Sequence, residues 1–352
     1  MDEEPLYVFK YYQQFKSHVL LGRGMNEMKK SLYGTLVAAF FLMCGSSAFA
    51  DPVTLSLGHI VKPDGPVAQA AVRFAKLINE RTNGEVKIDV YDSGTLGSQR
   101  DLLEGLQLGT VDITLSSPAV MSSITPKVSV FDLPYIFKDA AHAYRILDGE
   151  VGKEVFKDCE NNGYMCISVW ENGFRHTTNN KRAIKTPSDF NGLKIRAPES
   201  KVYIEMLKAL GANPTPMAFG ELFTALQNGT VDGQENPISQ SYSAHFQEVQ
   251  KYMTLDGHIY ACNPMLISLA AKDKLSDTQF KILVDTANEV RDWQRELVAK
   301  TECDMMNNMK AAGMEITVLS DEEKSEFVKV VKPVWLMFED VLGKDLIEKV
   351  SK

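Results

Sequence analysis

The chain has 352 residues, of which 44% are hydrophobic and 24% are charged, a composition typical of globular proteins and unlike that of disordered or fibrous ones. This length predicts about two domains and rules out a single small module. The 38 basic and 46 acidic residues give a net charge of −8, which argues against nucleic acid as a partner because phosphate binding depends on clustered Lys and Arg.

Residues 28–50 have the pattern of a secretory signal peptide. Two lysines form a charged start, an apolar stretch covers residues 32–43, and Ala-Phe-Ala at 48–50 is a small-residue cleavage site. The apolar stretch has about twelve residues, fewer than the roughly 20 that span a membrane. We therefore expect cleavage before Asp51, a periplasmic location and a soluble mature protein. Residues 1–24 match no targeting pattern.

Four of the five cysteines follow this signal. Export would place the protein in an oxidising compartment, so disulfides between Cys159 and Cys166 or between Cys262 and Cys303 are possible. Buried free thiols are the alternative, because cysteine often behaves as a small core residue.

The exported part begins with a predicted strand–helix–strand unit. Apolar and polar residues alternate over 53–57 as they do in a strand. Pro66 suits the first turn of a helix, and Gly84 ends this helix before a second strand at 86–90. Such a unit is typical of α/β proteins.

A seven-residue pattern occurs twice in the chain. Leu-Gln-Leu-Gly-Thr-Val-Asp at 106–112 returns as Leu-Gln-Asn-Gly-Thr-Val-Asp at 226–232, and each copy is expected to be a helix that ends at Gly and enters a short strand. Two such junctions favour two similarly built lobes. The alternative is that the two segments are alike only because both end a helix in the same way. After the extension and signal peptide at 1–50, we expect one lobe from 51–172 and about 262–301, and another from 173–261 and about 302–352.

Two capping boxes predict the C-terminal helices. Residues 276–313 are expected to form one helix that opens with Ser276 and Gln279. At 1.5 Å per residue this helix would be roughly 55 Å long, which is longer than one lobe is wide, so it is expected to span both. A second box at 320–323 starts a final helix toward Gly343.

Common catalytic and metal-binding motifs are absent from the sequence. It contains no Gly-x-Gly-x-x-Gly, phosphate loop, His-Glu-x-x-His or Gly-x-Ser-x-Gly, and none of its six histidines has zinc-ligand spacing to a cysteine or a second histidine. We therefore expect no catalytic residues, no metal and no cofactor, although a catalytic site assembled from distant residues would escape such a search.

The densest group of candidate binding residues lies in 170–237. Arg196 ends a short strand, from which its side chain could reach a crevice, and its planar fork suits a carboxylate. From chemistry alone, a surface position or an internal ion pair is commoner for such an arginine. Phe219 would equally be a core residue, and Asn236 before Pro237 could make a turn.

Four motifs in this region, taken in order, resemble one family. They are Gly-Phe-Arg-x-Thr-Thr at 173–178, Gly-Leu-Lys-Ile-Arg at 192–196, Gly-Ala-x-Pro-Thr-Pro-Met-Ala-Phe at 211–219 and Ala-Leu-Gln-x-Gly-x-Val-Asp-Gly-Gln-Glu-Asn-Pro at 225–237. The chain is similar from Val53 onward to the DctP family, the substrate-binding proteins of tripartite ATP-independent periplasmic (TRAP) transporters. The resemblance implies an α/β, type II-like periplasmic binding protein with a ligand cleft between two lobes and a long helix spanning both.

The resemblance also implies a function and a set of site residues. Such a protein closes on a small carboxylate and delivers it to TRAP membrane permease subunits. Arg196 then matches the arginine that grips the ligand carboxylate, Arg175 matches a second pocket arginine, and Asn236 and Phe219 match residues that support the ligand. Further candidates, by position in relatives or by proximity to the motifs, are His59, Ser116, Ser117, Trp170 and Glu199.

The ligand itself is left open. Two pocket arginines suit a C4-dicarboxylate, whereas one arginine for a carboxylate and one for hydroxyls suit a sugar acid such as a uronate. Many relatives that take C4-dicarboxylates carry Lys in place of Arg175, which favours a hydroxylated acid. The resembled family is also associated with sialic acid and with aromatic or keto acids, and Trp170 leaves an aromatic ligand open.

Two other functions fit the same scaffold. A secreted enzyme is disfavoured by the missing motifs, and turnover of a bound acid would reveal it. A sensor for a membrane receptor would use the same pocket, so only neighbouring genes or a physical partner would separate it from a transport protein. Most members of the resembled family are monomers, and we expect a monomer here.

Overall fold

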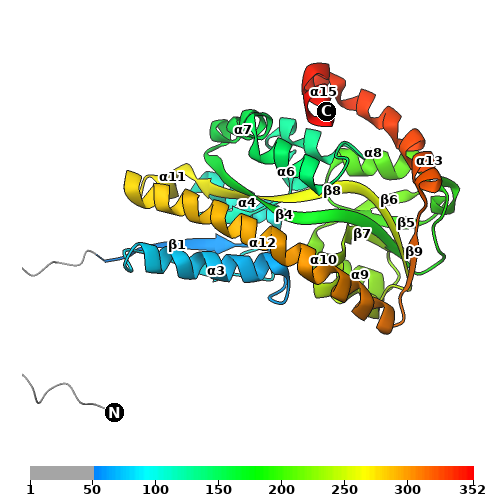
Figure 1. Ribbon diagram of the computed structural model, residues 1–352, viewed down its shortest axis with the longest axis horizontal. Helices are drawn as coiled ribbons and strands as arrows, with labels where there is room; N and C mark the ends of the chain where they lie inside the picture. Colours follow the sequence, from blue (N-terminus) through cyan, green and yellow to red (C-terminus); the bar gives the residue numbers. More distant parts are fainter. Residues whose placement is uncertain (1–50) are drawn as a thin grey trace, which may run out of the picture. The chain divides into compact units, whose positions relative to one another are not determined.

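A computed structural model describes residues 51–352 of the chain. The extension, the signal peptide and the cleavage site predicted within residues 1–50 lie outside the described residues. In the described part, nine strands form one mixed sheet, and Figure 1 shows helices on both of its faces, which confirms the α/β class. No helix of residues 51–352 has the length and apolar character needed to cross a membrane.

The first elements confirm the predicted strand–helix–strand unit. β1 (Val53–Gly58) and β2 (Val86–Tyr91) pair in parallel, and α3 (Pro66–Arg81) connects them. Pro66 occupies the first turn of α3, whose apolar residues are buried at helical spacing. After α3 the backbone turns at Gly84, whose φ of 82° is a left-handed value that glycine adopts readily.

The repeated heptapeptide forms the same junction twice. α4 (Gln99–Leu108) passes through Gly109 into β3 (Ile113–Leu115), and α9 (Phe219–Gln227) passes through Gly229 into β7 (Gly233–Pro237). The two aspartates that close the pattern also have equivalent partners. Asp112 Oδ2 accepts the backbone N–H of Ser56 on β1 at 2.8 Å, and Asp232 Oδ2 accepts that of Lys194 on β5 (Lys194–Ala197) at 2.9 Å.

The remaining elements complete the two sides of the sheet; η denotes a 3-10 helix. Between β3 and β4 (Tyr164–Asn179) lie α5 (Pro118–Met121), η1 (Pro126–Asp132), α6 (Ala140–Asp148), α7 (Glu150–Lys157) and η2 (Asp158–Asn162). Between β4 and β8 (Tyr252–Ser268) lie η3 (Pro187–Phe190), β5, α8 (Lys201–Ala209), β6 (Asn213–Pro216), α9, β7, α10 (Ile238–Ser243) and η4 (Phe246–Glu248). After β8 come α11 (Leu269–Lys272), α12 (Asp277–Ala311) and β9 (Glu315–Val318).

The long antiparallel strands β4 and β8 join the two sides of the sheet. The strand order is β2-β1-β3-β8-β4-β7-β5-β6, and β9 also pairs with β8. One end of β8 pairs with β3 and the other end pairs with β9. Two groups of strands therefore flank one continuous pair. The lobe boundaries predicted from the sequence stay a prediction, because residues 51–352 cluster as one compact unit.

The long C-terminal helix is confirmed with its cap. The Ser276 hydroxyl accepts the backbone N–H of Gln279, whose side chain accepts the N–H of Ser276. α12 packs against α3, β4 and α10, and Figure 1 shows it, in orange, running beside the central strands. It therefore contacts elements from both sides of the sheet.

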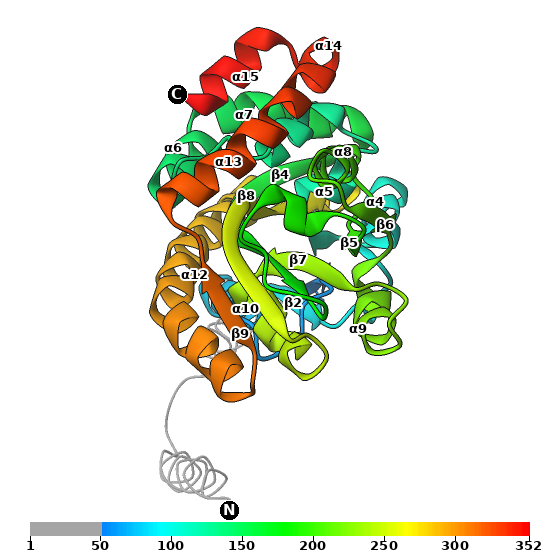
Figure 2. The same cartoon turned by 90° about the vertical axis from the view of Figure 1, so that its right-hand side faces the viewer.

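The last predicted helix is shorter than expected. The capping box of Ser320 and Glu323 opens α13 (Asp321–Val331), but this helix does not continue to Gly343. It gives way to η5 (Lys332–Phe338), followed by α14 (Glu339–Leu342) and α15 (Lys344–Ser351), which Figure 2 shows in red beyond α6 and α7. Pro333 explains the break, because it has no N–H to donate inside a helix.

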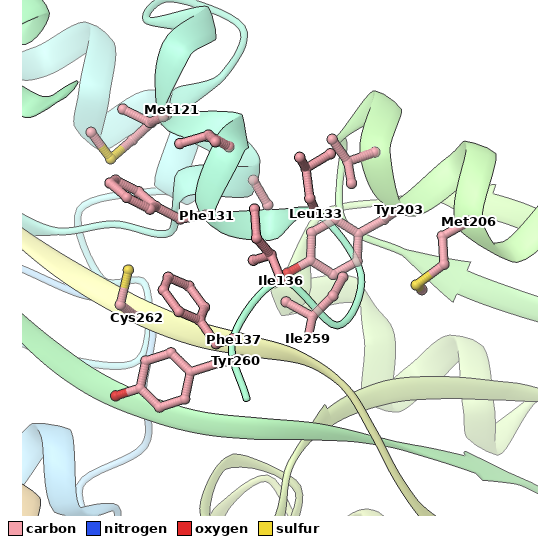
Figure 3. Packing of buried hydrophobic residues seen from close by; sticks show 14 of the residues in the cluster. Met121, Phe131, Leu133, Ile136, Phe137, Tyr203, Met206, Ile259, Tyr260 and Cys262 are labelled. Carbon is pink, nitrogen blue, oxygen red and sulfur yellow. The ribbon is translucent and has the colours of Figure 1, made fainter. Parts of the chain in front are cut away.

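A large apolar core lies between β8 and the helices beside it. In Figure 3, Phe137 from the loop before α6 packs on Tyr260 of β8, with their rings edge-to-face at 5.7 Å. Cys262 lies in the same cluster. The four cysteines of the described chain are free, so neither of the two disulfides considered above is formed.

Candidate ligand-binding site

A pocket opens between the two groups of strands that flank β4 and β8, with a cavity volume of about 60 Å³. One wall comes from the chain after β1, the start of α4 and the chain after β3. The opposite wall comes from the carboxyl end of β5, the start of α9 and the end of β7. Open α/β sheets bind ligands at the carboxyl ends of strands, which makes this pocket the candidate site.

Arg196 is a buried cation in this pocket. It lies near the carboxyl end of β5 and is 4% exposed, and burial lowers the pKa of Arg196 to about 10, so it stays charged at neutral pH. Its Nε and Nη2 atoms donate to the carbonyl oxygen of Met217, at 3.1 and 2.9 Å, and its guanidinium lies 6.0 Å from the ring centre of Phe219. Among residues 51–352, no carboxylate pairs with Arg196, and its Nη1 group has no hydrogen-bond partner.

Arg175 also lines the pocket, but its charge is already offset. Its Nη2 atom donates to Glu235 Oε1 at 2.9 Å, and its Nε atom donates to Oε2 of the same carboxylate at 2.5 Å. Burial acts to lower the pKa of Arg175, but Glu235, Tyr203 and Asp132 together raise it above its ordinary value. The ring of Tyr203 lies 5.1 Å from the guanidinium carbon. Arg175 is therefore half of a bidentate internal ion pair.

The ion pair continues into a buried charged network. His258 Nε2 lies 3.0 Å from Glu235 Oε2, and His258 Nδ1 lies 3.1 Å from Asp256 Oδ1. Burial acts to lower the pKa of His258, but the two carboxylates raise it to about 9, so the imidazole is protonated at neutral pH. The cations Arg175 and His258 balance the anions Glu235 and Asp256. The network adds no net charge to the pocket.

Apart from the exposed Arg100 and Glu199, neutral side chains provide the other polar groups of the pocket. Asn172 donates to Gln240 Oε1 at 2.8 Å, Ser117 donates to Gln99 Oε1 at 3.0 Å, and all four residues line the pocket. The Nδ2 group of Asn263, on β8, is buried and has no partner among the described residues. Amides and hydroxyls of this kind both donate and accept, which suits the hydroxyl groups of a ligand.

The structure brings six of the nine predicted site residues together. Lining the pocket are Arg196, Arg175, Asn236, Phe219, Ser117 and Glu199. Asn236 donates to Gln234 Oε1 at 2.6 Å, so its amide is held in place by its own strand. Phe219 is half-buried at the start of α9, and Glu199 is exposed at the rim. Two of the three remaining candidates, His59 and Ser116, lie close by.

His59 and Ser116 lie behind the pocket wall and not on its surface. His59 directly precedes the lining residues Ile60 and Val61, and burial lowers the pKa of its imidazole. In the described chain, the two ring nitrogens of His59 and the hydroxyl oxygen of Ser116 have no hydrogen-bond partner. Ser117, the residue before α5, lines the pocket, whereas Ser116 does not.

Trp170 is a structural residue and does not reach the pocket. It is fully buried, its Nε1 atom donates to the carbonyl oxygen of Ala287 on α12 at 3.0 Å, and its ring packs edge-on against Phe74 of α3 at 6.3 Å. Trp170 therefore fastens two helices to β4. Trp170 does not line this pocket, so the geometry does not support its predicted ligand contact, which stays a prediction.

Sequence reasoning missed Glu235, the buried partner of Arg175, and several residues that line the pocket. Glu235 lies inside the motif at 225–237, in which only its neighbour Asn236 was predicted as a site residue. Asn172 directly precedes the motif at 173–178 and could have been included on that ground. Gln240 and Asn263 carried no local signal, because only the packing of α10 and β8 brings them to the pocket.

The fold and this pocket define a class of protein. The sheet is mixed α/β and has a cleft between two groups of strands. In this cleft, one buried arginine has no carboxylate partner, and most of the other polar groups are neutral. These features are those of a binding protein for a small organic acid. The chain belongs to the DctP family, bacterial extracellular solute-binding protein family 7, whose sequence model matches residues 57–340.

Individual relatives agree with this assignment. The chain is 36% identical to the 2,3-diketo-L-gulonate-binding periplasmic protein YiaO of Escherichia coli, over 86% of this chain and 90% of that protein. It is 34% identical to the C4-dicarboxylate-binding periplasmic protein DctP of Rhodobacter capsulatus, over 92% of this chain and 98% of that one. A TRAP solute-binding protein from Polaromonas, solved with D-erythronate, is 36% identical with a TM-score of 0.82, over 85% of this chain and 98% of that chain.

The family assignment decides between a transport protein and an enzyme. The chain is a TRAP-type solute-binding protein for small organic acids, and the family works with TRAP permeases. It is a transport protein and not an enzyme. Family membership also assigns it to the bacterial periplasmic or extracellular binding proteins.

Proposed function

We propose that this protein binds a hydroxylated monocarboxylate, such as an aldonate or a uronate, and delivers it to a TRAP permease. In this proposal the ligand carboxylate lies on Arg196, above the ring of Phe219. The ligand hydroxyls contact the neutral side chains of Asn172, Asn236 and Asn263.

The charge balance of the pocket carries this proposal. Three arginines line the pocket, and two of them already have carboxylate partners: Arg175 pairs with Glu235, and the exposed Arg100 pairs with Glu104 at 3.4 Å. Arg196 alone has none among the described residues. A second ligand carboxylate would therefore meet either a neutralised arginine or the exposed Glu199 at the rim, which repels it.

The neutral wall supports the hydroxylated part of the proposal. A buried amide without a partner, such as Nδ2 of Asn263, is unfavourable unless a ligand group hydrogen-bonds to it. A plain alkyl acid would leave this group unpaired, whereas a hydroxyl would satisfy it. Sites built to hydrogen-bond a hydroxyl reject analogues that lack it.

The relatives keep a dicarboxylate ligand as an alternative. YiaO is named for a diketo sugar acid and the Polaromonas protein was solved with D-erythronate, which favours a polyhydroxylated ligand. DctP of Rhodobacter capsulatus is named for C4-dicarboxylates, and a dicarboxylate here would need Arg100 to leave Glu104 and turn to the ligand. This second candidate keeps the same transport role.

A matched ligand pair tests the proposal. D-galactonate and galactarate differ in one end group, which is a hydroxymethyl in the first and a second carboxylate in the second. We expect calorimetric titration of residues 51–352 to give at least about tenfold tighter binding of galactonate or D-erythronate than of galactarate or succinate. Tighter binding of galactarate or succinate would favour the dicarboxylate alternative, and binding of none of these acids or uronates would refute the proposal.

A further inference from the structure

A second cavity lies behind the central strands, on the face opposite the ligand pocket. Asn172 and Arg175 of β4 line the ligand pocket, whereas Glu171, Phe174 and His176 line this second cavity. Neighbouring residues of a strand point to opposite faces. The two cavities therefore lie on opposite faces of β4. We call the second one the rear cavity; its volume is about 380 Å³.

The strand pair between the two cavities is irregular where they face each other. Asn172 is an extra residue on β4, because Glu171 pairs with Cys262 and Gly173 pairs with the next residue, Ala261. Further along, the partners of β4 jump from Ile259 to Thr254, so residues 255–258 of β8 bulge out. Bulges bend a strand and interrupt its ladder.

Two glycines permit this irregular geometry. Gly173 has a φ of 112° and Gly257 a φ of 56°, values that favour glycine. Both residues line the rear cavity. We call residues 171–177 of β4 and 254–262 of β8 the bend segment. It is the part of the pair that is least held by regular strand pairing.

Helices line the other side of the rear cavity, which is partly open to solvent. Val298, Ala299 and Glu302 come from α12, and Lys324 comes from α13. The lining is polar: Tyr144 donates to Glu171 at 2.7 Å, and the Nζ atom of Lys324 lies 3.5 Å from where a Cβ would stand on Gly257. These walls do not belong to β4 or β8, so the cavity changes volume when the strand pair bends relative to them.

We propose that the rear cavity controls how readily the two groups of strands close over the ligand pocket. Bending of β4 and β8 at the bend segment that narrows the ligand pocket widens the rear cavity, because the two lie on opposite faces of one strand pair. A group that fills the rear cavity therefore stabilises the closed form. The volume and packing of this cavity set the closure equilibrium, and thereby the ligand affinity, without any contact to the ligand.

Wedge substitutions from two different elements test this proposal. Ala299→Trp on α12 and Ala140→Trp at the start of α6 each add a large side chain to a residue that lines the rear cavity. Lys300→Trp is the control, because Lys300 is exposed like its neighbour Ala299 but does not line the cavity. Far-UV and near-UV circular dichroism would select variants that are folded.

The first readout needs no ligand. Spin labels on cysteines that replace Glu104 of α4 and Thr224 of α9, both exposed, report the distance across the ligand pocket by pulsed electron resonance. The exposed Cys303 is first replaced by Ser. We expect both wedge variants to move the ligand-free distance distribution toward shorter values, and Lys300→Trp to leave it unchanged. An unchanged distribution, or one moved toward longer distances in the two wedges, would overturn the proposal.

The second readout is affinity, and it rests on the proposed function. Apparent affinity scales with the fraction of protein in the binding-competent state, so we expect about three- to tenfold tighter binding of D-galactonate by the wedge variants. If galactonate does not bind the unsubstituted protein, the proposed ligand class is wrong, while the distance measurement still decides the role of the rear cavity. Shorter distances together with weaker galactonate binding would contradict the link between the cavity and affinity.

Discussion

Arg175 and Arg196 illustrate how two arginines in one pocket come to differ. Both are 4% exposed, yet Arg175 is gripped by Glu235 while Arg196 donates only to a backbone carbonyl. A buried guanidinium without an anion is unfavourable, so the free energy gained on pairing it with a ligand carboxylate is large. The two residues are alike in the sequence and differ only in their neighbours.

Substitution of Arg196 is expected to abolish tight binding. Arg196→Ala should weaken binding of D-galactonate by about 2 to 5 kcal/mol, because it removes one partner of a desolvated charge pair. Arg196→Lys should also bind poorly, since an ammonium lacks the bidentate fork. Calorimetric titration measures both. Arg100→Ala is the matched control and should change the affinity less than about threefold; an Arg196→Ala protein with unchanged affinity would show that the carboxylate binds elsewhere.

His258 is expected to make the stability of the protein depend on pH. Its folded pKa of about 9 lies above the ordinary value of 6.5, so its contribution is fully present below pH 6.5 and is lost as the pH rises through 9. The loss amounts to about 3 kcal/mol of unfolding free energy. Urea unfolding at pH 6 and pH 10 measures it. A His258→Gln variant should be less stable at pH 6 and should lack this fall; an equal fall in both proteins would assign it to other groups.

At the scale of elements, the repeated heptapeptide is a structural device. In both copies the helix ends at glycine, a valine is buried, and an aspartate accepts a backbone N–H from the neighbouring strand. The repeat therefore marks two equivalent strand–helix corners. It is not a ligand-binding motif, because neither Asp112 nor Asp232 lines the pocket.

Equivalent substitutions in the two copies are expected to have equivalent effects. Asp112→Ala and Asp232→Ala should each destabilise the protein by about 1 to 3 kcal/mol, since each leaves a strand N–H without its acceptor. The Asn variants, which keep an acceptor oxygen, should lose less. Chemical denaturation measures these differences, and an Ala variant as stable as the parent protein would show that its aspartate does not hold the corner.

For the whole molecule, the free cysteines predict how the chain responds to redox conditions. Cys159 and Cys262 are buried and Cys166 is partly buried. Burial raises the pKa of the Cys159 thiol to about 12 and the pKa values of the other two thiols well above their ordinary value, so all three are unreactive in the folded state. Cys303 is exposed. The fold is therefore held by its core and hydrogen bonds and not by disulfides.

Thiol counting checks this prediction. A thiol reagent added to residues 51–352 should label one cysteine, Cys303, in the folded protein and all four after unfolding. The melting temperature should be the same with and without a reducing agent. Two labelled thiols after unfolding, or a lower melting temperature under reducing conditions, would reveal a disulfide. A Cys303→Ser variant is the control and should show no labelling when folded.

The amino-acid sequence by itself determined the features that depend on neighbouring residues. Alternation and Pro66 predicted the first strand–helix–strand unit, the capping box of Ser276 and Gln279 predicted the start of α12, and four ordered motifs identified the family. These signals are local because hydrogen bonds in helices, caps and turns join residues a few positions apart. Only Pro333 was overlooked, and it explains why α13 ends early.

The tertiary structure alone decided which side chains meet. The pairing of Arg175 with Glu235 joins residues 60 positions apart, and no spacing rule could have separated this arginine from Arg196. It likewise placed Trp170 against α12 and α3, and Asn263 at the pocket. Such contacts depend on how β4, β8 and the helices pack, and packing between distant segments leaves no local pattern in a single sequence. The charge of the pocket, and hence the proposed ligand class, follows from those contacts.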